Sequence, residues 1–179
     1  MKLISHRGNL YGPNPTEENN PDYVCKATAQ GFYAEVDIWL QDNKIMLGHD
    51  EPKYEVNLEW LMTRHDSLYL HCKNVAAFLY FKDRTRFNAF YHDTENYVIT
   101  SNGETIVRET GIVEGVYYPP NCIFSMPESA SIRLPYNRSL ISDYAGLIYN
   151  FDHEDYDKVP EIIKFKEEEN EPDNIVNLK

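Results

Sequence analysis

Two carboxylates inside an apolar segment constrain this chain more than any other feature. The segment from Glu35 to Asp50 reads as two short strands joined by the polar turn 41–44. Because alternate residues of a strand share a face, Glu35 and Asp37 point the same way. Adjacent carboxylates repel each other and are costly to bury, so a cation between them is the simplest reason to keep them. His49 then closes the second strand.

The first half of the chain alternates expected strands with expected helices. Strands are expected over 2–6, over 32–40 with the hairpin partner 44–49, and over 67–73. Helices are expected from Pro21 to a stop at Gly31, over 58–64, and over 75–84 behind a cap at Asn74. Such alternation is typical of a parallel sheet.

The second half follows a different pattern. Strands are expected over 87–91, 97–100, 122–125 and 139–143. The first two stand only a few residues apart, whereas a parallel crossover needs about a dozen, so no full helix fits between them. The pair Asn102-Gly103, flanked by apolar runs, predicts a type I′ hairpin turn.

Length and charge narrow the class of protein. At 179 residues, 42% of them hydrophobic, we expect one globular domain over 1–165, followed by an acidic tail over 166–179. The formal charge of −12 argues against non-specific binding to nucleic acid or anionic membranes, because both need a basic surface. Three widely spaced cysteines, and no signal-peptide core or membrane-length apolar run, predict a cytoplasmic protein with free thiols.

Reactive side chains stand at or near the ends of the strands in the first half. Their convergence at one edge of a sheet is typical of α/β active sites. Arginine and lysine bind phosphate oxygens, a hard cation neutralises phosphoryl charge, and histidines exchange protons near neutral pH. The residue types favour phosphodiester chemistry on a small-molecule substrate. They are His6, Arg7, Glu35, Asp37, His49, His71 and Lys73.

The order of these motifs resembles the glycerophosphodiester phosphodiesterase family over residues 6–73. The matching run is His6-Arg7-Gly8, Glu18-Asn19-Asn20, Glu35-x-Asp37, His49-Asp50, and a strand closed by Lys73. The resemblance implies a phosphodiester hydrolase on a (β/α)8 barrel that uses a divalent cation, usually calcium or magnesium. The roles it implies are acid and base for His6 and His49, phosphate contact for Arg7 and Lys73, metal ligation for Glu35 and Asp37, and a position near the metal and substrate for Glu18.

Two departures from the family pattern shape the expectation. His71 stands where the family carries a metal-binding glutamate, and an imidazole favours manganese, iron or zinc over calcium. His71 is therefore expected to ligate the metal or to contact substrate. The chain is also shorter than the roughly 200 residues that a full barrel needs at least. We expect an α/β fold, a compact or incomplete TIM-like barrel with reduced helices in its C-terminal half.

Other readings stay open at this point. A non-catalytic relative that binds a phosphate ester is the alternative, because His71 replaces an acid and the second half lacks room for helices. A metal-dependent sugar isomerase or lyase is a third reading, which the paired Arg7 and Lys73 argue against. The strand ends His92-Asp93 and Ser142-Asp143 are further candidates to line the site.

Overall fold

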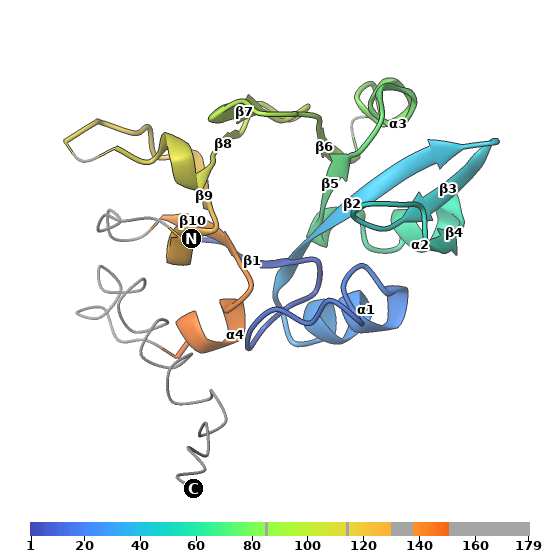
Figure 1. The fold of residues 1–179 in the computed structure, drawn as a ribbon, viewed down its shortest axis with the longest axis horizontal. Coiled ribbons are helices and arrows are strands. Elements are labelled where there is room, and N and C mark those ends of the chain that lie inside the picture. Colours follow the sequence, from blue (N-terminus) through green and yellow to red (C-terminus); the bar gives the residue numbers. More distant parts are fainter. Residues whose placement is uncertain (85, 114, 130–137, 151–179) are drawn as a thin grey trace, which may run out of the picture.

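The computed structural model describes residues 1–84, 86–113, 115–129 and 138–150. These residues contain ten strands and four short helices (Figure 1). The strands are β1 (Leu3–His6), β2 (Tyr33–Gln41), β3 (Lys44–Leu47), β4 (Tyr54–Val56), β5 (Leu68–Cys72), β6 (Asn88–Phe90), β7 (Tyr97–Ile99), β8 (Thr105–Val107), β9 (Cys122–Ser125) and β10 (Ser139–Ser142). The helices are α1 (Pro21–Ala29), α2 (Leu58–Met62), α3 (Val75–Phe81) and α4 (Ala145–Ile148), with 3₁₀ turns η1 (His65–Ser67), η2 (Glu109–Gly111) and η3 (Pro127–Ser129). The predicted domain end at 165 and the tail 166–179 lie outside the described residues.

The strands form one mixed sheet that curls into a half-barrel, so the expected TIM-like (β/α) barrel is wrong. Neighbours pair in parallel along the order β6-β5-β2-β1-β10-β9-β8. Strand β7 pairs antiparallel with β8, and the β3–β4 hairpin extends antiparallel from β2. The β6–β7 and β7–β8 connections are too short for crossover helices, and the described parts of the two later connections form 3₁₀ turns.

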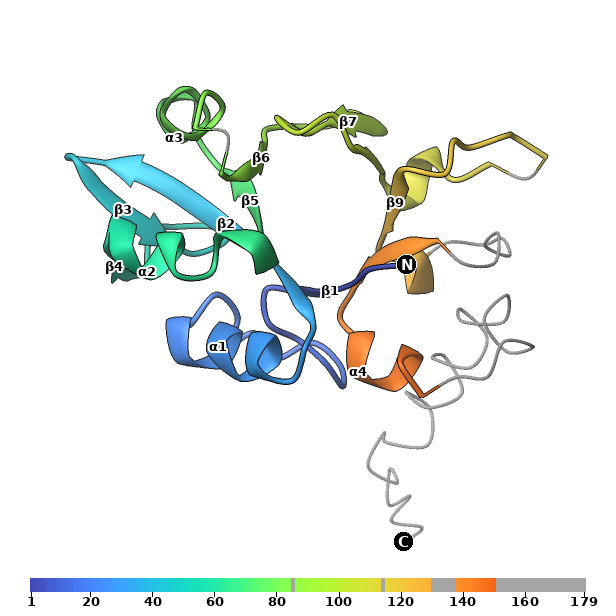
Figure 2. The same ribbon diagram turned by 180° about the vertical axis from the view of Figure 1, so that it is seen from behind.

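The helices begin where the sequence supplies a cap. Asn20 accepts a hydrogen bond from Asp22 N at 2.9 Å, and Pro21 opens α1. Asn74 accepts one from Ala77 N at 2.8 Å at the start of α3. These side chains satisfy amides that have no partner inside the helix. In Figure 2, α1, α2 and α3 lie outside the part of the sheet formed by β2 and β5, and α4 lies beside β1 and α1.

Both predicted hairpins form, the first with its turn over 41–44, but the turn type predicted for the second is not the one observed. The β2–β3 turn has both central residues, Asp42 and Asn43, at positive φ of 51° and 59°, which is the type I′ geometry. The β7–β8 connection was the predicted type I′ turn, but there only Gly103 has positive φ (81°), and the last strand pair is Ile99 with Thr105. That prediction is wrong, because a longer loop needs one left-handed residue instead of two.

The sheet is open between β6 and β7. No ladder joins these two strands in the described residues, but Ser101 bridges them. Its amide donates to Ala89 O at 2.7 Å, and its hydroxyl accepts from Ala89 N at 3.0 Å. The same hydroxyl donates to Phe87 O at 2.9 Å. One serine therefore supplies the contacts that a further strand pair would make.

Apolar side chains fill the inside of the curl and the layer beneath the helices. One cluster joins strands around the curl and contains Ile4, Tyr69, Phe90, Val98, Ile106, Ile123 and Ile141. A larger cluster packs α1, α2 and α3 against β2, β3 and β5. Among the described residues, no helix has the length and apolar character needed to cross a bilayer.

Candidate active site

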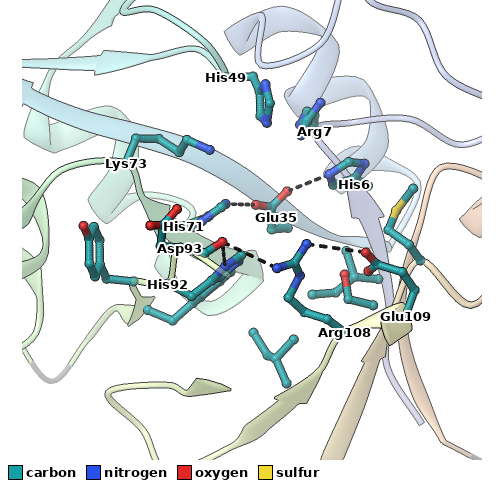
Figure 3. Close-up of a pocket in the computed structure, with 16 residues that line it drawn as sticks. His6, Arg7, Glu35, His49, His71, Lys73, His92, Asp93, Arg108 and Glu109 are labelled. Carbon is teal, nitrogen blue, oxygen red and sulfur yellow. Dashed lines mark hydrogen bonds and ion pairs between the residues drawn. The ribbon is translucent and has the colours of Figure 1, made fainter. Parts of the chain in front are cut away.

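The carboxyl ends of the parallel strands open onto one rim of the sheet, and a cavity of about 390 Å³ lies there (Figure 3). A second cavity of about 650 Å³ adjoins it, is lined by Glu18, and shares His6, Arg7 and His49 with the first. The rim thus gathers residues that are far apart in sequence. The predicted site residues that line the first cavity are His6, Arg7, Glu35, His49, His71 and Lys73.

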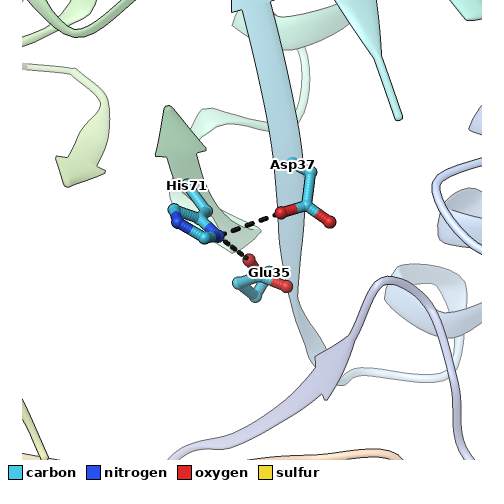
Figure 4. A group of neighbouring side chains, drawn as sticks. All are labelled: Glu35, Asp37 and His71. Atoms are coloured by element: carbon cyan, nitrogen blue, oxygen red, sulfur yellow. Dashed lines mark ion pairs between the residues drawn. The ribbon is translucent and has the colours of Figure 1, made fainter. Parts of the chain in front are cut away.

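The acid pair and His71 form a group of three potential metal ligands (Figure 4). The β2–β5 register places Asp37 opposite His71. His71 Nδ1 lies 2.9 Å from Asp37 Oδ1 and 3.4 Å from Glu35 Oε1. Their ligand atoms all lie within 4.8 Å of one another, and both carboxylates are buried, with 3% and 0% of Glu35 and Asp37 exposed.

The charges around this group stabilise its ionised forms. Burial alone would raise the pKa of Asp37, but the contact with His71 and the charges of Arg7 and Lys73 hold that pKa well below its usual range. Burial likewise opposes protonation of His71, yet its contacts with Asp37 and Glu35 raise its pKa. A proton on His71 and a metal ion would therefore occupy the same electrostatic position between the two acids.

Two buried oxygens of the acid pair lack a hydrogen bond. Glu35 Oε2 and Asp37 Oδ1 have no hydrogen-bond partner among the described residues. Asp37 Oδ1 is within ion-pair distance of His71 and Lys73, at 2.9 and 3.4 Å, but neither contact has the direction of a hydrogen bond. Buried acceptors are nearly always satisfied in folded proteins, so a cation bound at these oxygens fits the residues present.

Asn19 fixes the other side of Asp37. Its amide donates to Asp37 Oδ2 at 2.9 Å, and its carbonyl oxygen accepts from Asp37 N at 2.9 Å. Asn19 is buried and has a φ of 63°, a left-handed conformation that asparagine tolerates better than most residues. The middle residue of Glu18-Asn19-Asn20 thus orients a predicted metal ligand, a function that the sequence analysis did not assign to it.

His6 is held by a carboxylate that follows β10, the strand paired with β1. Its Nδ1 lies 2.9 Å from Asp143 Oδ1, and its Nε2 lies 4.0 Å from Glu35 Oε2. Burial would lower the pKa of His6, but its hydrogen bond to the Asp143 carboxylate and the charge of Glu35 raise it. Because Nδ1 is engaged, Nε2 is the nitrogen left to exchange protons in the cavity. Asp143, an open candidate in the sequence, is therefore a neighbour of the predicted catalytic pair.

Arg7 is engaged by the protein's own acids. Its Nη1 donates to Glu18 Oε2 at 2.9 Å, and its Nε lies 2.9 Å from Asp37 Oδ2. Asn9 donates to the other Glu18 oxygen at 2.9 Å and to Asp143 Oδ1 at 2.7 Å. Glu18 therefore contacts Arg7, and Arg7 in turn contacts Asp37, so Glu18 acts on the potential metal ligands through Arg7. Sequence reasoning missed Asn9, whose partner Asp143 lies far along the chain.

His49 and Lys73 stand on the segments that follow β3 and β5. His49 Nδ1 lies 2.7 Å from Asp50 Oδ1, and the His49 side chain is 40% exposed at the rim. The preceding Gly48 has a φ of 149°, and a Cβ there would lie 2.1 Å from Glu51 O. A glycine is required for the chain to turn His49 toward the cavity. Lys73 N donates to Ile38 O at 2.9 Å, which holds it beside β2.

A wall of stacked rings supports His71. The rings of Phe90 and His92 both lie against it, with centroids 4.9 and 4.4 Å from the His71 ring, 6.0 Å from each other, and nearly parallel planes. Burial and the neighbouring charges of His71 and Arg108 lower the pKa of His92. His92 and Asp93 line the cavity, as the sequence left open, and so do Arg108 and Glu109, which sequence reasoning missed.

Behind Asp143 lies the buried carboxyl of Glu128. It accepts hydrogen bonds from Ser142 Oγ at 3.0 Å and from Asp143 N at 3.1 Å. Burial raises the pKa of Glu128 from 4.5 to about 7. The folded state therefore binds this proton more tightly than the unfolded state, and stability is lost as the pH rises from 4.5 toward 7.

We expect Glu128→Gln to increase stability at alkaline pH. Glutamine keeps an acceptor for Ser142 and Asp143 but carries no charge to desolvate. The free energy of unfolding should rise by up to about 3 kcal/mol near pH 8 and change little near pH 4. Urea denaturation at the two pH values measures this difference. Equal effects at both would show that Glu128 does not titrate in this range.

Comparisons of the chain with protein-family models, with curated proteins and with solved structures find no match. The geometry of the rim is therefore the basis for any statement about function.

Proposed function

We propose that this protein is a metal-dependent phosphodiester hydrolase whose active site is the cavity at the rim of the sheet. The observation that carries the proposal is the pair of unsatisfied buried oxygens on Glu35 and Asp37, beside the His6–Asp143 pair. Buried carboxylate oxygens without a hydrogen-bond donor indicate a cation, and a histidine oriented by a carboxylate is suited to proton transfer. The resemblance to glycerophosphodiester phosphodiesterases supports the same reaction.

Glu35, Asp37 and His71 would hold the divalent cation. When bound, it would neutralise the charge that builds on the phosphoryl oxygens. The imidazole of His71 shifts the expected preference toward manganese or zinc, whereas an all-oxygen set would suit magnesium or calcium. Calcium and magnesium remain the ions that the resemblance implies, and the ligand chemistry of this chain ranks them second.

The chain's own residues account for binding and proton transfer. Lys73 and Arg7 line the cavity and attract the phosphate, with Arg7 held in place by Glu18. His6, fixed through Nδ1 by Asp143, takes or gives a proton at Nε2. His49 faces the same cavity from the β3 side and carries out the second of the two proton transfers. One histidine takes the proton of the attacking oxygen, and the other protonates the leaving oxygen.

Hydrolysis of bis(p-nitrophenyl) phosphate across a panel of divalent ions tests the proposal. We expect release of p-nitrophenol that EDTA abolishes and that added manganese or zinc restores. Hydrolysis that persists after complete removal of metal would contradict the assignment of the acid pair. The absence of hydrolysis with every ion would contradict the proposal that the protein is a hydrolase.

A phosphate-ester-binding protein without turnover is the second candidate. The observation that favours it is the engagement of Arg7 by Glu18 and Asp37, which leaves less of its charge for a substrate. Metal-dependent binding of a phosphate ester, measured by calorimetry in the absence of hydrolysis, would identify this function.

We expect His71→Glu to change the metal preference. The substitution replaces a nitrogen ligand by a carboxylate and adds a negative charge between Glu35 and Asp37. Metal titrations followed by thermal unfolding should show stronger stabilisation by calcium and magnesium relative to zinc. A preference that stays the same in His71→Glu would remove His71 from the ligand set.

A further inference from the structure

Arg108 places a positive charge on the wall of the cavity opposite Lys73. It follows β8, which runs parallel to β9, so its side chain reaches the rim where the site residues gather. Figure 3 shows its guanidinium between Asp93 and Glu109, on the side of the cavity opposite Lys73 and His49. Neither the acid pair nor the proton-transfer residues contact it in any ion pair or hydrogen bond between described residues.

The contacts of Arg108 within the protein are long. Its Nη2 lies 3.4 Å from Glu109 Oε1, and its Nη1 lies 3.5 Å from Asp93 O. Charge-assisted hydrogen bonds are normally about 2.7–2.9 Å, as in the contact of Arg7 with Glu18 at 2.9 Å. The side chains of Arg108 and Glu109 are each 26% exposed. The Glu109 carboxylate is therefore a weakly seated partner that an incoming anion can replace.

The other cationic side chains of the cavity already contact acids of the protein. Arg7 is held by Glu18 and Asp37, and Lys73 lies 3.4 Å from Asp37. Arg7 and Lys73 on that side of the cavity are sufficient to bind the single negative charge of a phosphodiester. A guanidinium on the opposite wall presents a planar fork that matches the two oxygens of a carboxylate or phosphate. Its position suits a second anionic group on the same ligand.

We propose that Arg108 binds a second anionic group of the substrate. On this inference, which rests on the proposed function, the substrate class is a small phosphodiester whose one arm carries a carboxylate or a further phosphate. Arg108 is a specificity-determining residue and takes no part in bond breaking. A purely structural function is the competing explanation, because Arg108 Nη1 also lies 3.5 Å from Asp93 O and links the segment after β6 to β8.

Three p-nitrophenyl phosphodiesters separate these explanations. Their second arms are ethyl, 2-carboxyethyl and choline, so the arm is neutral, negative or positive while the leaving group stays the same. In the metal-loaded protein, we expect kcat/KM to be highest for 2-carboxyethyl. Arg108→Gln should reduce the ratio of 2-carboxyethyl to ethyl by about 10–100-fold, the effect of one charge-assisted hydrogen bond. Arg108→Glu should favour choline over 2-carboxyethyl.

A matched variant controls for the loss of a surface arginine. Arg86 lines a separate cavity with Lys2 and Glu104, and Arg86→Gln should leave the ratio unchanged. If Arg108 only ties segments together, Arg108→Gln will alter all three diesters equally and the ratio will not move. That result, or equal rates for the three diesters in the unaltered protein, overturns the inference.

Binding measurements keep the inference separate from the proposed enzyme. If no diester is hydrolysed with any ion, the proposed hydrolase fails, and calorimetry then compares 2-carboxyethyl phosphate with ethyl phosphate. Tighter binding of 2-carboxyethyl phosphate that is lost in Arg108→Gln supports Arg108 as an anion-binding residue without catalysis. Equal affinity for the two esters, or a preference that survives in Arg108→Gln, overturns it.

Discussion

His6→Ala is expected to lower kcat for phosphodiester hydrolysis by about 10²–10⁴-fold, the usual contribution of a general acid or base. The loss follows from the removal of Nε2, the nitrogen that faces Glu35 across the cavity at 4.0 Å. Steady-state hydrolysis of bis(p-nitrophenyl) phosphate measures it, and far-UV circular dichroism checks the fold. His49→Ala should cause a loss of similar size, since the reaction needs both an acid and a base.

His65 offers a matched control for these variants. It hydrogen-bonds Met62 O at 2.8 Å and lines a different cavity, so His65→Ala should leave kcat unchanged. Full activity in both His6→Ala and His49→Ala would exclude the proton-transfer roles.

The pH dependence of kcat/KM distinguishes an effect of Asp143 on His6 from a general loss of structure. Asp143→Asn replaces the charged acceptor that raises the pKa of His6 by a neutral amide, so that pKa should fall. If His6 acts as the base, the acid limb of kcat/KM will move to lower pH, because the neutral imidazole then persists at lower pH. A structural loss alone would lower the whole profile without moving its limb.

Asp37→Asn is expected to have the largest effect on stability. Asp37 is fully buried and faces Arg7, His71 and Lys73, so an amide there removes a negative charge that these three cations share. Breaking a buried ion pair from one side costs about 3–5 kcal/mol. Urea unfolding near neutral pH measures the change. As a control, Asp66→Asn, at an exposed carboxylate, should leave the free energy of unfolding unchanged.

The same variant tests the metal site. Manganese or zinc should raise the urea midpoint of the unaltered protein, because an ion that binds only the folded state stabilises it. The midpoint of Asp37→Asn should not respond. Since the pKa of Asp37 is held below its usual range, its contribution is present above pH of about 4 and declines as the pH falls further. An unchanged midpoint together with an unchanged metal response would contradict the predicted function of Asp37.

Local sequence patterns predicted how the candidate site is built. Alternation along a strand placed Glu35 and Asp37 on one face, and both contact His71 on the neighbouring strand. Pro21 marked the start of α1 and the cap at Asn74 marked the start of α3 correctly. These features depend on residues within a few positions of one another, which is the range over which periodicity and capping act.

The fold and the supporting residues depend on long-range contacts that local patterns do not contain. The alternation before residue 84 predicted a compact or incomplete (β/α) barrel, yet the described residues between β6 and β10 contain no α-helix, and no strand pairing joins β6 to β7. Asn9 and Asp143 meet although 134 positions separate them. The short strand β4 was also missed, because its three residues carry no periodic signal.

Parallel pairing of the first strand with the last has a consequence for how the protein matures. Leu3, Ile4 and Ser5 find their partners in Leu140, Ile141 and Ser142, so β1 gains this neighbour only when almost the whole described chain has left the ribosome. Contacts of such high sequence separation form late and slowly. The same docking event delivers Asp143 to His6. A nascent or truncated chain that ends before β10 therefore cannot assemble this pair, and any activity that needs the pair should appear only after β10 has been synthesised.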